Sequence, residues 1–381
     1  ALGYAALTAN TTGAQNVGLG AYALQANTTA SYNVGIGYNT LGLTTTGQQN
    51  VAIGGEALDA NTTGGDNVAV GTSALGANTT AASNTAVGVS SMAANTTGQY
   101  NTAVGTRALN ANTTASFTVA VGYEALKLNT TGAGNVGIGQ SALYTNTTGA
   151  NNTAVGYGAL DANTTAANNV AVGYNALGAN TTGAQNTAVG QNSLPVNTTG
   201  AQNTAVGVNA LVLNTEGSYN VSLGNYAGQT ITTGDGCVSL GYNANPSSAT
   251  VDNEFTLGSS SITSLRCNDT TISSLSDSRD KTDVIDSPYG LGFINTVRPV
   301  QFKWESRDGN GKDGWTRVGF IAQELLVACD GNNAVLDLVS EENPEKLEAK
   351  YGNLLPIAIQ AIQELSAQVD ALTARITTLE G

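Results

Sequence analysis

A 17-residue motif recurs along the first 241 residues of this chain without an insertion or a deletion. The motif reads Asn-x-Ala-Val-Gly-x-x-Ala-Leu-x-x-Asn-Thr-Thr-Gly-x-x. A unit this short cannot bury its apolar side chains alone, so each must be one coil that stacks on its neighbours. The period therefore predicts an all-β solenoid, a rod of stacked coils. The first asparagine of the motif, with Thr118 in its place once, stands at Asn16, Asn33, Asn50, Asn67, Asn84, Asn101, Asn135, Asn152, Asn169, Asn186, Asn203 and Asn220.

Each unit divides into a strand and two turns. The segment 102–104 is short and β-branched and ends at Gly105, which is typical of a strand that runs into a tight turn. The Ala-Leu pair then points inward, and Asn-Thr-Thr-Gly makes the second turn. We expect glycine to supply positive φ, and asparagine to cap its own turn and to accept a left-handed backbone. Identical asparagines would stack into hydrogen-bonded ladders. Fourteen coils about 4.8 Å apart would give a rod on the order of 65 Å long.

The composition changes twice after the repeats end. Residues 242–275 are rich in Ser, Thr and Asn, and we interpret them as a distal cap or tip that covers the end of the solenoid shaft 1–241. Residues 276–381 hold 27 of the 40 charged residues and both tryptophans, Trp304 and Trp315. They are predicted to form a separate, small α+β domain with its own core.

Strand, helix and coiled coil are all predicted in this C-terminal domain. Residues 293–304 indicate a strand and a turn around Pro299, and residues 318–328 indicate an amphipathic helix. A heptad pattern predicts a coiled coil over 352–380, and its β-branched first column with leucine in the second favours two strands. The columns are Leu355, Ile362, Val369 and Ile376, and Ala358, Leu365, Leu372 and Leu379.

Charge and residue content exclude several classes of function. The chain carries 13 basic against 27 acidic residues, a net charge of −14, whereas nucleic acid and anionic membranes attract basic surfaces. It has no histidine, so any catalysis would have to use Ser, Lys, Asp or Glu. Cys237, Cys267 and Cys329 have neither zinc-ligand nor disulfide-framework spacing. We therefore expect no cofactor, no metal, no nucleic-acid partner and no membrane insertion.

Two features of the repeat surface allow a structural or a functional interpretation. The Asn-Thr-Thr triplets, as at Asn27, Asn61 and Asn129, match the N-glycosylation acceptor pattern, but every turn needs that asparagine for its geometry. Tyrosine often follows the glycine, and an exposed aromatic column can stack on sugar rings. We favour turn chemistry for the asparagines and packing along the rod for the tyrosines, which include Tyr38, Tyr123, Tyr157 and Tyr174.

The Asn-x-Ala-Val-Gly signature resembles the head repeats of trimeric bacterial adhesins and the shaft repeats of phage tail fibres, although the adhesin period is shorter than 17 residues. Both of these are built as trimers, so the resemblance implies a homotrimeric β-roll or β-helix shaft. Periodicity by itself shows only that coils stack, and the heptad pattern favours a dimer. We expect a homotrimer, because we give the symmetry of the fibre greater weight.

Three segments of the C-terminal domain together resemble the intramolecular chaperone domain of phage endosialidases and of other tail fibres and tailspikes. The resemblance covers residues 276–381 and implies a domain that trimerises the chain, helps it to fold in register and is then released by autoproteolysis. It further implies that Ser276 and Lys281 are the catalytic pair, and that the bond between Ser276 and Asp277 is cut. The segments are Ser276-Asp277-Ser278-Arg279-Asp280-Lys281, Gly319-Phe320-Ile321-Ala322-Gln323-Glu324, and Tyr351 to Leu365 running into the coiled coil.

A serine with a lysine is the nucleophile and base arrangement that remains open to a chain without histidine. Lys281 can act as the base only without its proton, which requires burial or a positive neighbour such as Arg279. On spacing alone, Ser-Asp-Ser is ordinary linker composition, and only the surrounding domain favours the dyad. The cut would happen once per chain, so the fibre itself is not expected to be an enzyme.

A structural and adhesive function fits these observations first: a phage tail fibre, assembled in the host cytoplasm and carried by the virion, that attaches to a host cell-surface receptor such as a saccharide. A trimeric adhesin on the bacterial cell surface is the alternative. Ala1 stands in mid-repeat, so we expect the natural polypeptide to begin earlier, with a virion-attachment domain or a signal peptide that would separate the two. A polysaccharide-degrading tailspike is a third hypothesis, but it needs paired carboxylates. The seven acidic residues of 1–250 are scattered, at Glu56, Asp59, Asp66, Glu124, Asp161, Glu216 and Asp235.

Overall fold

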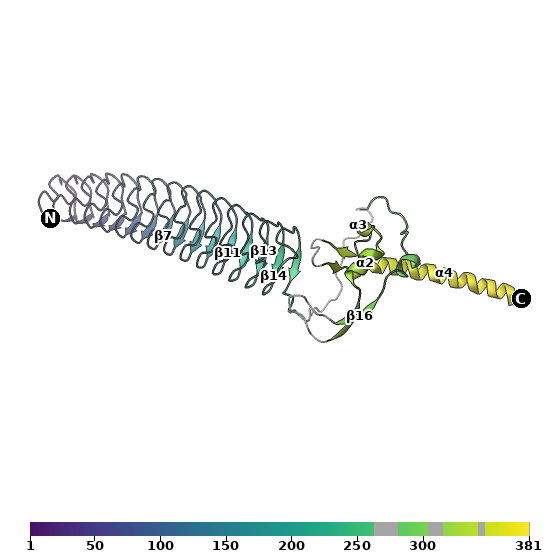
Figure 1. The fold of residues 1–381 in the computed structure, drawn as a ribbon. Coiled ribbons are helices and arrows are strands. Elements are labelled where there is room, and N and C mark those ends of the chain that lie inside the picture. The colour runs from purple at the N-terminus through teal and green to yellow at the C-terminus, as the bar shows by residue number, and fades with distance from the viewer. Residues whose placement is uncertain (263–280, 304–314, 342–346, 381) are drawn as a thin grey trace. The chain divides into compact units, whose positions relative to one another are not determined.

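The computed structural model describes residues 1–262, 281–303, 315–341 and 347–380. The chain divides into two compact units, Ala1–Ser259 and Ser260–Gly381 (Figure 1). The first unit contains the repeats, and the second contains the charged C-terminal region.

The first unit is a parallel β-solenoid, as the period predicts. Fifteen strands form one sheet in sequence order, each paired in parallel with the next, as the stacked arrows in Figure 1 show. Paired residues lie 17 positions apart, as Val51 and Val68 do. The strands are β1 (Val17–Leu19), β2 (Val34–Ile36), β3 (Val51–Ile53), β4 (Val68–Val70), β5 (Thr85–Val87), β6 (Thr102–Val104), β7 (Val119–Val121), β8 (Val136–Ile138), β9 (Thr153–Val155), β10 (Val170–Val172), β11 (Thr187–Val189), β12 (Thr204–Val206), β13 (Val221–Leu223), β14 (Val238–Leu240) and β15 (Phe255–Leu257).

The core of the solenoid consists of columns of small and aliphatic side chains. The middle residue of each strand from β1 to β14 is Ala, Gly or Ser and is buried. The Ala-Leu pair faces the same core, and both Ala57 and Leu58 are fully buried. The buried leucine column runs from Leu24 to Leu211, with Met92 in one coil. The inward orientation that the repeat predicts for both segments is confirmed.

Both asparagine columns are buried ladders. In the first, the amide N–H of Asn50 donates to Oδ1 of Asn33 in the preceding coil at 2.9 Å. In the second, Nδ2 of Asn78 donates to Oδ1 of Asn61 at 3.0 Å. Where a side chain meets an identical one in the next coil, a polar group repeats in the interior with its hydrogen bonds made. Oδ1 of Asn27 and of Asn214, which face Thr44 and Ile231 in the next coil, has no hydrogen-bond partner among the described residues. The predicted ladders are therefore confirmed.

The glycine that ends each strand allows a close approach between coils. Gly105 has φ of 138°, in the region that favours glycine. A Cβ atom at this position would lie 2.4 Å from the carbonyl oxygen of Gly122 in the next coil. The prediction that this glycine supplies positive φ is confirmed, and any side chain here would separate the coils.

The second turn does not follow the expected backbone. Neither Asn61 nor Gly64 has positive φ, whereas the non-glycine residues Gln49, Glu56 and Leu58 have φ of 59°, 59° and 51°. The expectation of a left-handed asparagine and glycine is therefore wrong for this turn. Asn61 caps the turn instead by donating from Nδ2 to the Gly64 carbonyl at 3.0 Å. The leucines take the strained conformation because it directs their side chains into the core.

The solenoid continues for one strand beyond the last clear repeat. Strand β15 pairs with β14 in the same register, Val238 with Phe255. Glu254 takes the place of the asparagine, and its carboxylate accepts the backbone N–H of Ser247 at 2.9 Å. The segment expected as a cap, 242–275, thus begins as a further coil. Its residues from 263 onward lie outside the described part of the chain, and the cap itself stays a prediction.

The second unit is small and mixes helices with strands, as predicted. Strands β16 and β17 pair antiparallel, and so do β18 and β19. Its described elements are α1 (Leu291–Ile294), β16 (Val300–Lys303), β17 (Thr316–Gly319), α2 (Ala322–Ala328), α3 (Asn333–Leu336), β18 (Val339–Ser340), β19 (Glu348–Ala349), the 3-10 helix η2 (Tyr351–Asn353) and α4 (Leu354–Glu380). The core of the unit is formed by Leu325, Cys329, Leu336, Leu338, Val339, Leu354 and Ile357.

Two elements of this unit begin later than expected. The region interpreted as strand from residue 293 starts with helix α1, and β16 begins only after Pro299. The helix expected from residue 318 starts at Ala322, because Val318 pairs with Gln301 in the β16–β17 sheet. Both errors come from a pairing between segments distant in sequence, which the local pattern does not contain.

Helix α4 is the element in which the coiled coil was predicted. Its core-facing residues are Leu354, Ile357 and Ala361, all near its start. From Ile362 to Glu380 every side chain is exposed except the half-buried Glu364. The heptad columns are therefore exposed in the single chain, with Ile362 66% and Leu379 85% exposed. Within the described residues, no helix is both long and apolar enough to cross a membrane.

Candidate functional site

The predicted catalytic pair lies at the border of the described residues. Ser276 and Asp277, the expected nucleophile and cleavage position, and Arg279 fall within 263–280, outside the described residues. Lys281 is the first residue described after them, and it is exposed in the single chain. The pairing of Ser276 with Lys281 and the cut after Ser276 therefore stay predictions.

The chain that continues from Lys281 is anchored to α4 at Gly290 and Leu291. The backbone N–H of Leu291 donates to Oε2 of Glu364 at 2.8 Å. The Gln360 side chain holds this carboxylate from the same helix, Nε2 to Oε1 at 3.2 Å. A Cβ atom on Gly290 would lie 2.1 Å from Oε1 of Glu364, so a side chain here would displace this carboxylate. The backbone ten positions after Lys281 is thus held by the helix that carries the heptads.

The Gly-Phe-Ile-Ala-Gln-Glu segment packs on Tyr351, in the third segment of the resemblance. The N–H of Phe320 donates to the Tyr351 hydroxyl at 3.2 Å, and the two rings meet edge to face with centroids 5.3 Å apart. A Cβ atom on Gly319 would lie 2.7 Å from the same hydroxyl. The structure therefore brings together two of the three segments on which the resemblance rests.

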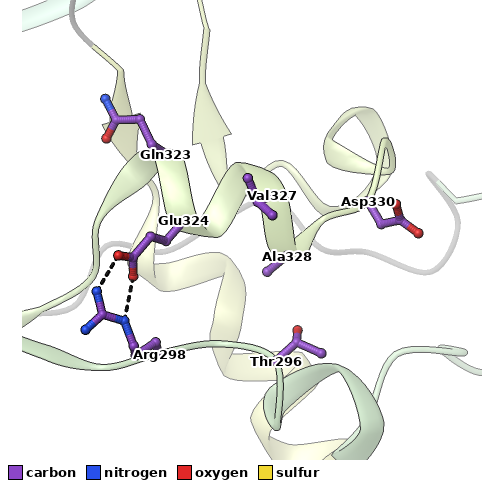
Figure 2. Close-up of a pocket in the computed structure, with 7 residues that line it drawn as sticks. All are labelled: Thr296, Arg298, Gln323, Glu324, Val327, Ala328 and Asp330. Carbon is purple, nitrogen blue, oxygen red and sulfur yellow. Dashed lines mark hydrogen bonds and ion pairs between the residues drawn. The ribbon is translucent and has the colours of Figure 1, made fainter.

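The same segment supplies the acid of an ion pair with Arg298. Nε of Arg298 donates to Oε2 of Glu324 at 2.9 Å, and Nη2 donates to Oε1, as the two dashed lines in Figure 2 show. These bonds and the positive charge lower the pKa of the Glu324 carboxyl, and the carboxylate raises the pKa of Arg298. A two-point pair of this kind fixes the position of helix α2 relative to the segment before β16.

An open groove of about 650 Å³ lies beside this pair. Figure 2 shows Val327 and Ala328 of α2 along the groove, with Thr296 across from them. Among the lining residues the ionised groups are Arg298 and Glu324, which neutralise each other, and Asp330. This lining offers an apolar strip with a polar edge, but no base beside a nucleophile. It suits contact with another surface better than catalysis.

The charges of the solenoid form a local network and not a pair of catalytic carboxylates. Oε1 of Glu124 accepts from Lys127 at 2.9 Å and from Arg107 at 3.1 Å. Lys127 also donates to the Tyr144 hydroxyl at 3.1 Å. The hydrogen bond from Lys127 is the main cause that lowers the pKa of Glu124. The network ties neighbouring coils together and leaves this carboxylate occupied.

The glycosylation and tyrosine alternatives can now be weighed against geometry. Asn27, Asn61 and Asn129 are fully buried, and their amide groups donate within the solenoid. A buried amide cannot carry an oligosaccharide, which supports turn chemistry. Tyr157 and Tyr174 stack on each other with centroids 5.4 Å apart, which supports packing along the rod.

Some contacts of this unit could not be found from sequence. The Arg298–Glu324 pair joins residues 26 positions apart, and the bond from Leu291 to Glu364 spans 73 positions. Glu364 stands outside both heptad columns, so the pattern gave it no role. Among the described residues, no group of three or more His, Cys, Asp and Glu side chains is placed to hold a metal ion.

Comparison with known families gives one match, in the C-terminal region. Residues 276–334 match a family described as chaperone of endosialidase. The match begins at Ser276, includes Lys281 and the Gly-Phe-Ile-Ala-Gln-Glu segment, and leaves the solenoid and α4 outside it. No curated protein and no solved structure matches the chain. The C-terminal region is thus similar to the chaperone of endosialidase family over the first two of the three segments, while the third, Tyr351 to Leu365, lies outside the match.

Proposed function

We propose that this chain is the subunit of a structural fibre whose C-terminal domain assembles three copies and then releases itself. The observation that carries the proposal is the match of residues 276–334 to the chaperone of endosialidase family. Its first matched residue is Ser276, the residue assigned as the nucleophile. The solenoid is the fibre, and the second unit is the assembly domain.

The release step rests on Ser276 and Lys281. A serine hydroxyl becomes a nucleophile when a neighbouring amine takes its proton, and lysine does this in chains that lack a histidine base. The step is hydrolysis of the peptide bond after Ser276, with one water consumed and no other reactant. Each chain is cut once, so the domain is a single-turnover protease and not a catalyst in the usual sense.

The assembly step rests on α4. Its heptad columns are exposed in the single chain from Ile362 to Leu379. Exposed leucine, isoleucine and valine in heptad spacing are buried when helices of several copies pack together. The groove along Val327 and Ala328 is a second apolar strip that such assembly can cover. Three copies are proposed because the fibres that the repeats resemble are trimers.

The solenoid would act in attachment to a host cell-surface receptor, as part of a phage tail fibre. The alternative, a trimeric adhesin on a bacterial surface, shares the repeat but would need secretion and a membrane anchor. A polysaccharide-degrading tailspike has less support, since Glu124 is held by Lys127 and Arg107. A virion-attachment domain would favour the fibre, and a signal peptide with a membrane anchor would favour the adhesin.

The test compares freshly expressed full chain with Ser276→Ala, Lys281→Ala and a matched lysine control, Lys350→Ala. Lys350 lies in the same domain but pairs with Asp337, at 2.8 Å. Intact mass and denaturing gels should show a fragment of 105 residues from the parent and the control, and none from the two site variants. Light scattering of an uncut variant should give three times 38.3 kDa.

Two results would contradict parts of this proposal. A parent that stays whole for days while remaining trimeric would exclude the dyad and make the C-terminal domain a permanent foot of the fibre. A Lys350→Ala chain that also stays whole would show that cleavage needs the intact domain, and Lys281 would lose its special role.

A further inference from the structure

One side of the solenoid sheet carries an apolar surface that the single chain leaves open. The first and third residues of each strand point away from the core, while the middle residue is buried in β1 to β14 and half-buried in β15. We call the outward first and third residues of β1 to β15 the strand face. The third residue is aliphatic in every strand: Leu19, Ile36, Ile53, Val70, Val87, Val104, Val121, Ile138, Val155, Val172, Val189, Val206, Leu223, Leu240 and Leu257.

The first position of the strand face is nearly as uniform. It is valine or threonine in β1 to β14 and phenylalanine in β15. Many of these side chains are substantially exposed, as Val104 is at 37% and Val17 at 50%. Because the paired strands place like residues side by side, the face consists of two columns of side chains that run the length of the sheet. Figure 1 shows the stacked strands that carry them.

Charged residues avoid this face throughout the repeats. None of the nine charged residues of 1–250 lies in a strand. Six of them stand between the strand-ending glycine and the second asparagine, in the segment that carries the buried Ala-Leu pair. The nine are Glu56, Asp59, Asp66, Arg107, Glu124, Lys127, Asp161, Glu216 and Asp235. The two outward strand positions therefore carry no charge in any of these repeats.

Aromatic residues border the strand face at both ends of the strands. One group stands two positions after the last strand residue, and another two positions before the first. All of them are exposed in the single chain. The first group includes Tyr38, Tyr123, Tyr157 and Tyr174, and the second Tyr32, Tyr100, Phe117 and Tyr219. These aromatic residues extend the apolar surface beyond the two columns, and the column before the strands carries a single charge, Asp66.

The size of the strand face matches that of a stable interface. Fifteen strands about 4.8 Å apart give a length near 70 Å, and a width of about 10 Å gives an area on the order of 700 Å². The largest apolar patch of a typical monomer is about 300–600 Å². A stable interface buries about 800 Å² on each partner. The strand face is thus larger than the apolar patches usual on monomers and close to the area that each partner buries in a stable interface.

We propose that the strand face is covered by the same face of other copies of this chain, around a common axis. A second copy offers an uncharged surface of the same length and the same strand spacing. The exposed heptads of α4 would also be buried by further copies of this chain. Both units therefore favour another copy of this chain as the partner. This inference takes from the proposed function only that copies assemble, and it does not depend on cleavage.

The test is chemical cross-linking of full chain in a Cys267→Ala background, with Val104→Cys on the strand face. Thr114→Cys is the matched control, since Thr114 is exposed but lies in the second turn. Cys237 and Cys329 are buried, so both variants carry one accessible thiol among the described cysteines. A short bis-maleimide should join chains through Cys at position 104 and leave the control as single chains.

The outcomes separate this inference from the proposed trimer. A monomeric mass in light scattering would overturn both. A trimeric mass with the Val104→Cys thiol freely labelled and not cross-linked would overturn the strand face alone. Binding of the Val104→Cys chain to neutral lipid vesicles, with protection of the thiol only there, would assign the face to a membrane and also overturn the inference. Equal cross-linking of the Val104→Cys and Thr114→Cys variants would show that the copies have no preferred contact face, and it would overturn the inference.

A second variant tests the same face without chemistry. Val104→Lys places a charge on an exposed position, so the coil itself can still form. We expect the solenoid of the assembled protein to unfold at a lower temperature than in Thr114→Lys, because only the first charge would be buried between copies. Equal melting of the two variants would contradict the proposal.

Discussion

The solenoid and the C-terminal unit obtain a packed interior by different routes. In the solenoid, a residue meets its counterpart 17 positions away, and one coil repeats the contacts of the last. In the C-terminal unit, contacts join unlike segments, such as Leu291 with Glu364 and Phe320 with Tyr351. The contacts of the solenoid interior can be read from the period of the sequence. The contacts of the C-terminal interior follow no regular spacing, so the sequence does not indicate them.

The two interiors also differ in polarity. The buried polar side chains are all found in the solenoid, among the described residues, and most belong to the two asparagine columns. The core of the C-terminal unit is aliphatic apart from Cys329. Repetition explains the difference, because an asparagine stacked on an asparagine has a donor and an acceptor at hand in every coil.

The largest effect is expected from breaking one asparagine ladder. Asn129 donates to Oδ1 of Asn112 at 3.3 Å and accepts from Nδ2 of Asn146 at 2.7 Å. In Asn129→Leu both neighbours lose a partner, so the solenoid should lose roughly 3–5 kcal/mol of unfolding free energy. Urea unfolding measures it, with Thr131→Val, an exposed turn residue, as control. A loss below about 1 kcal/mol would show that the ladder is not a main source of stability.

A cavity in the core of the C-terminal unit should lower the free energy of unfolding somewhat less, and only in that unit. Leu325 is 2% exposed in that core, whereas Val327 on the same helix is 80% exposed. Leu325→Ala should lower the stability of the unit by about 3 kcal/mol, and Val327→Ala by much less. Hydrogen exchange would locate the change. Equal loss of protection in residues 1–259 would mean that the two regions unfold as one.

The anchor between Leu291 and α4 should contribute less. Glu364→Ala removes the acceptor of the Leu291 N–H and should destabilise the C-terminal unit by about 1–2 kcal/mol. Glu364→Gln keeps an acceptor oxygen and should lose less. Gln363→Ala, an exposed neighbour on α4, is the control. Thermal unfolding, followed by the helix signal in circular dichroism, would show whether Glu364→Ala destabilises the unit more than Glu364→Gln. An equal loss of stability in the two variants would contradict the prediction.

The smallest expected effect is a pH dependence of the solenoid. Hydrogen bonds from Lys127 and Arg107 lower the pKa of Glu124 in the folded chain. The stabilisation is therefore complete above the unfolded pKa of about 4.3, and it is lost as pH falls through the lower folded value. Glu124→Gln should flatten this acid limb of the melting temperature. Superimposable profiles of parent and Glu124→Gln would contradict the assignment.

The solenoid could be predicted from sequence because its long-range contacts are a fixed offset. The strand at 102–104, the inward Ala-Leu pair and the asparagine ladders all follow from one unit repeated. The backbone of the second turn and of the Ala-Leu pair before it could not be predicted. Left-handed geometry at a leucine such as Leu58 costs ~1–2 kcal/mol by itself. Only the packed core makes that cost acceptable, and local preference points to the neighbouring asparagine.

In the C-terminal unit, the sequence predicts the kind of fold but not the contacts within it. Composition and the heptads predict an α+β domain and a long helix, and the resemblance points to Ser276 and Lys281. The start of α2 at Ala322 and the Arg298–Glu324 pair depend on how β16 and β17 pair, which no local pattern contains. Of the candidate site, Lys281 is described, while Ser276 lies outside the described residues.

The uninterrupted period has a consequence for copies that meet on the strand face. Sliding one copy past another by one coil keeps fourteen of the fifteen strand contacts, so many staggered arrangements differ little in energy. A perfectly regular rod thus carries no information about where its partner should stop. That information must come from a part of the chain that does not repeat. Once the ends are aligned, any later slip has to break the contacts of every coil together, and the aligning domain can leave without the fibre losing its register.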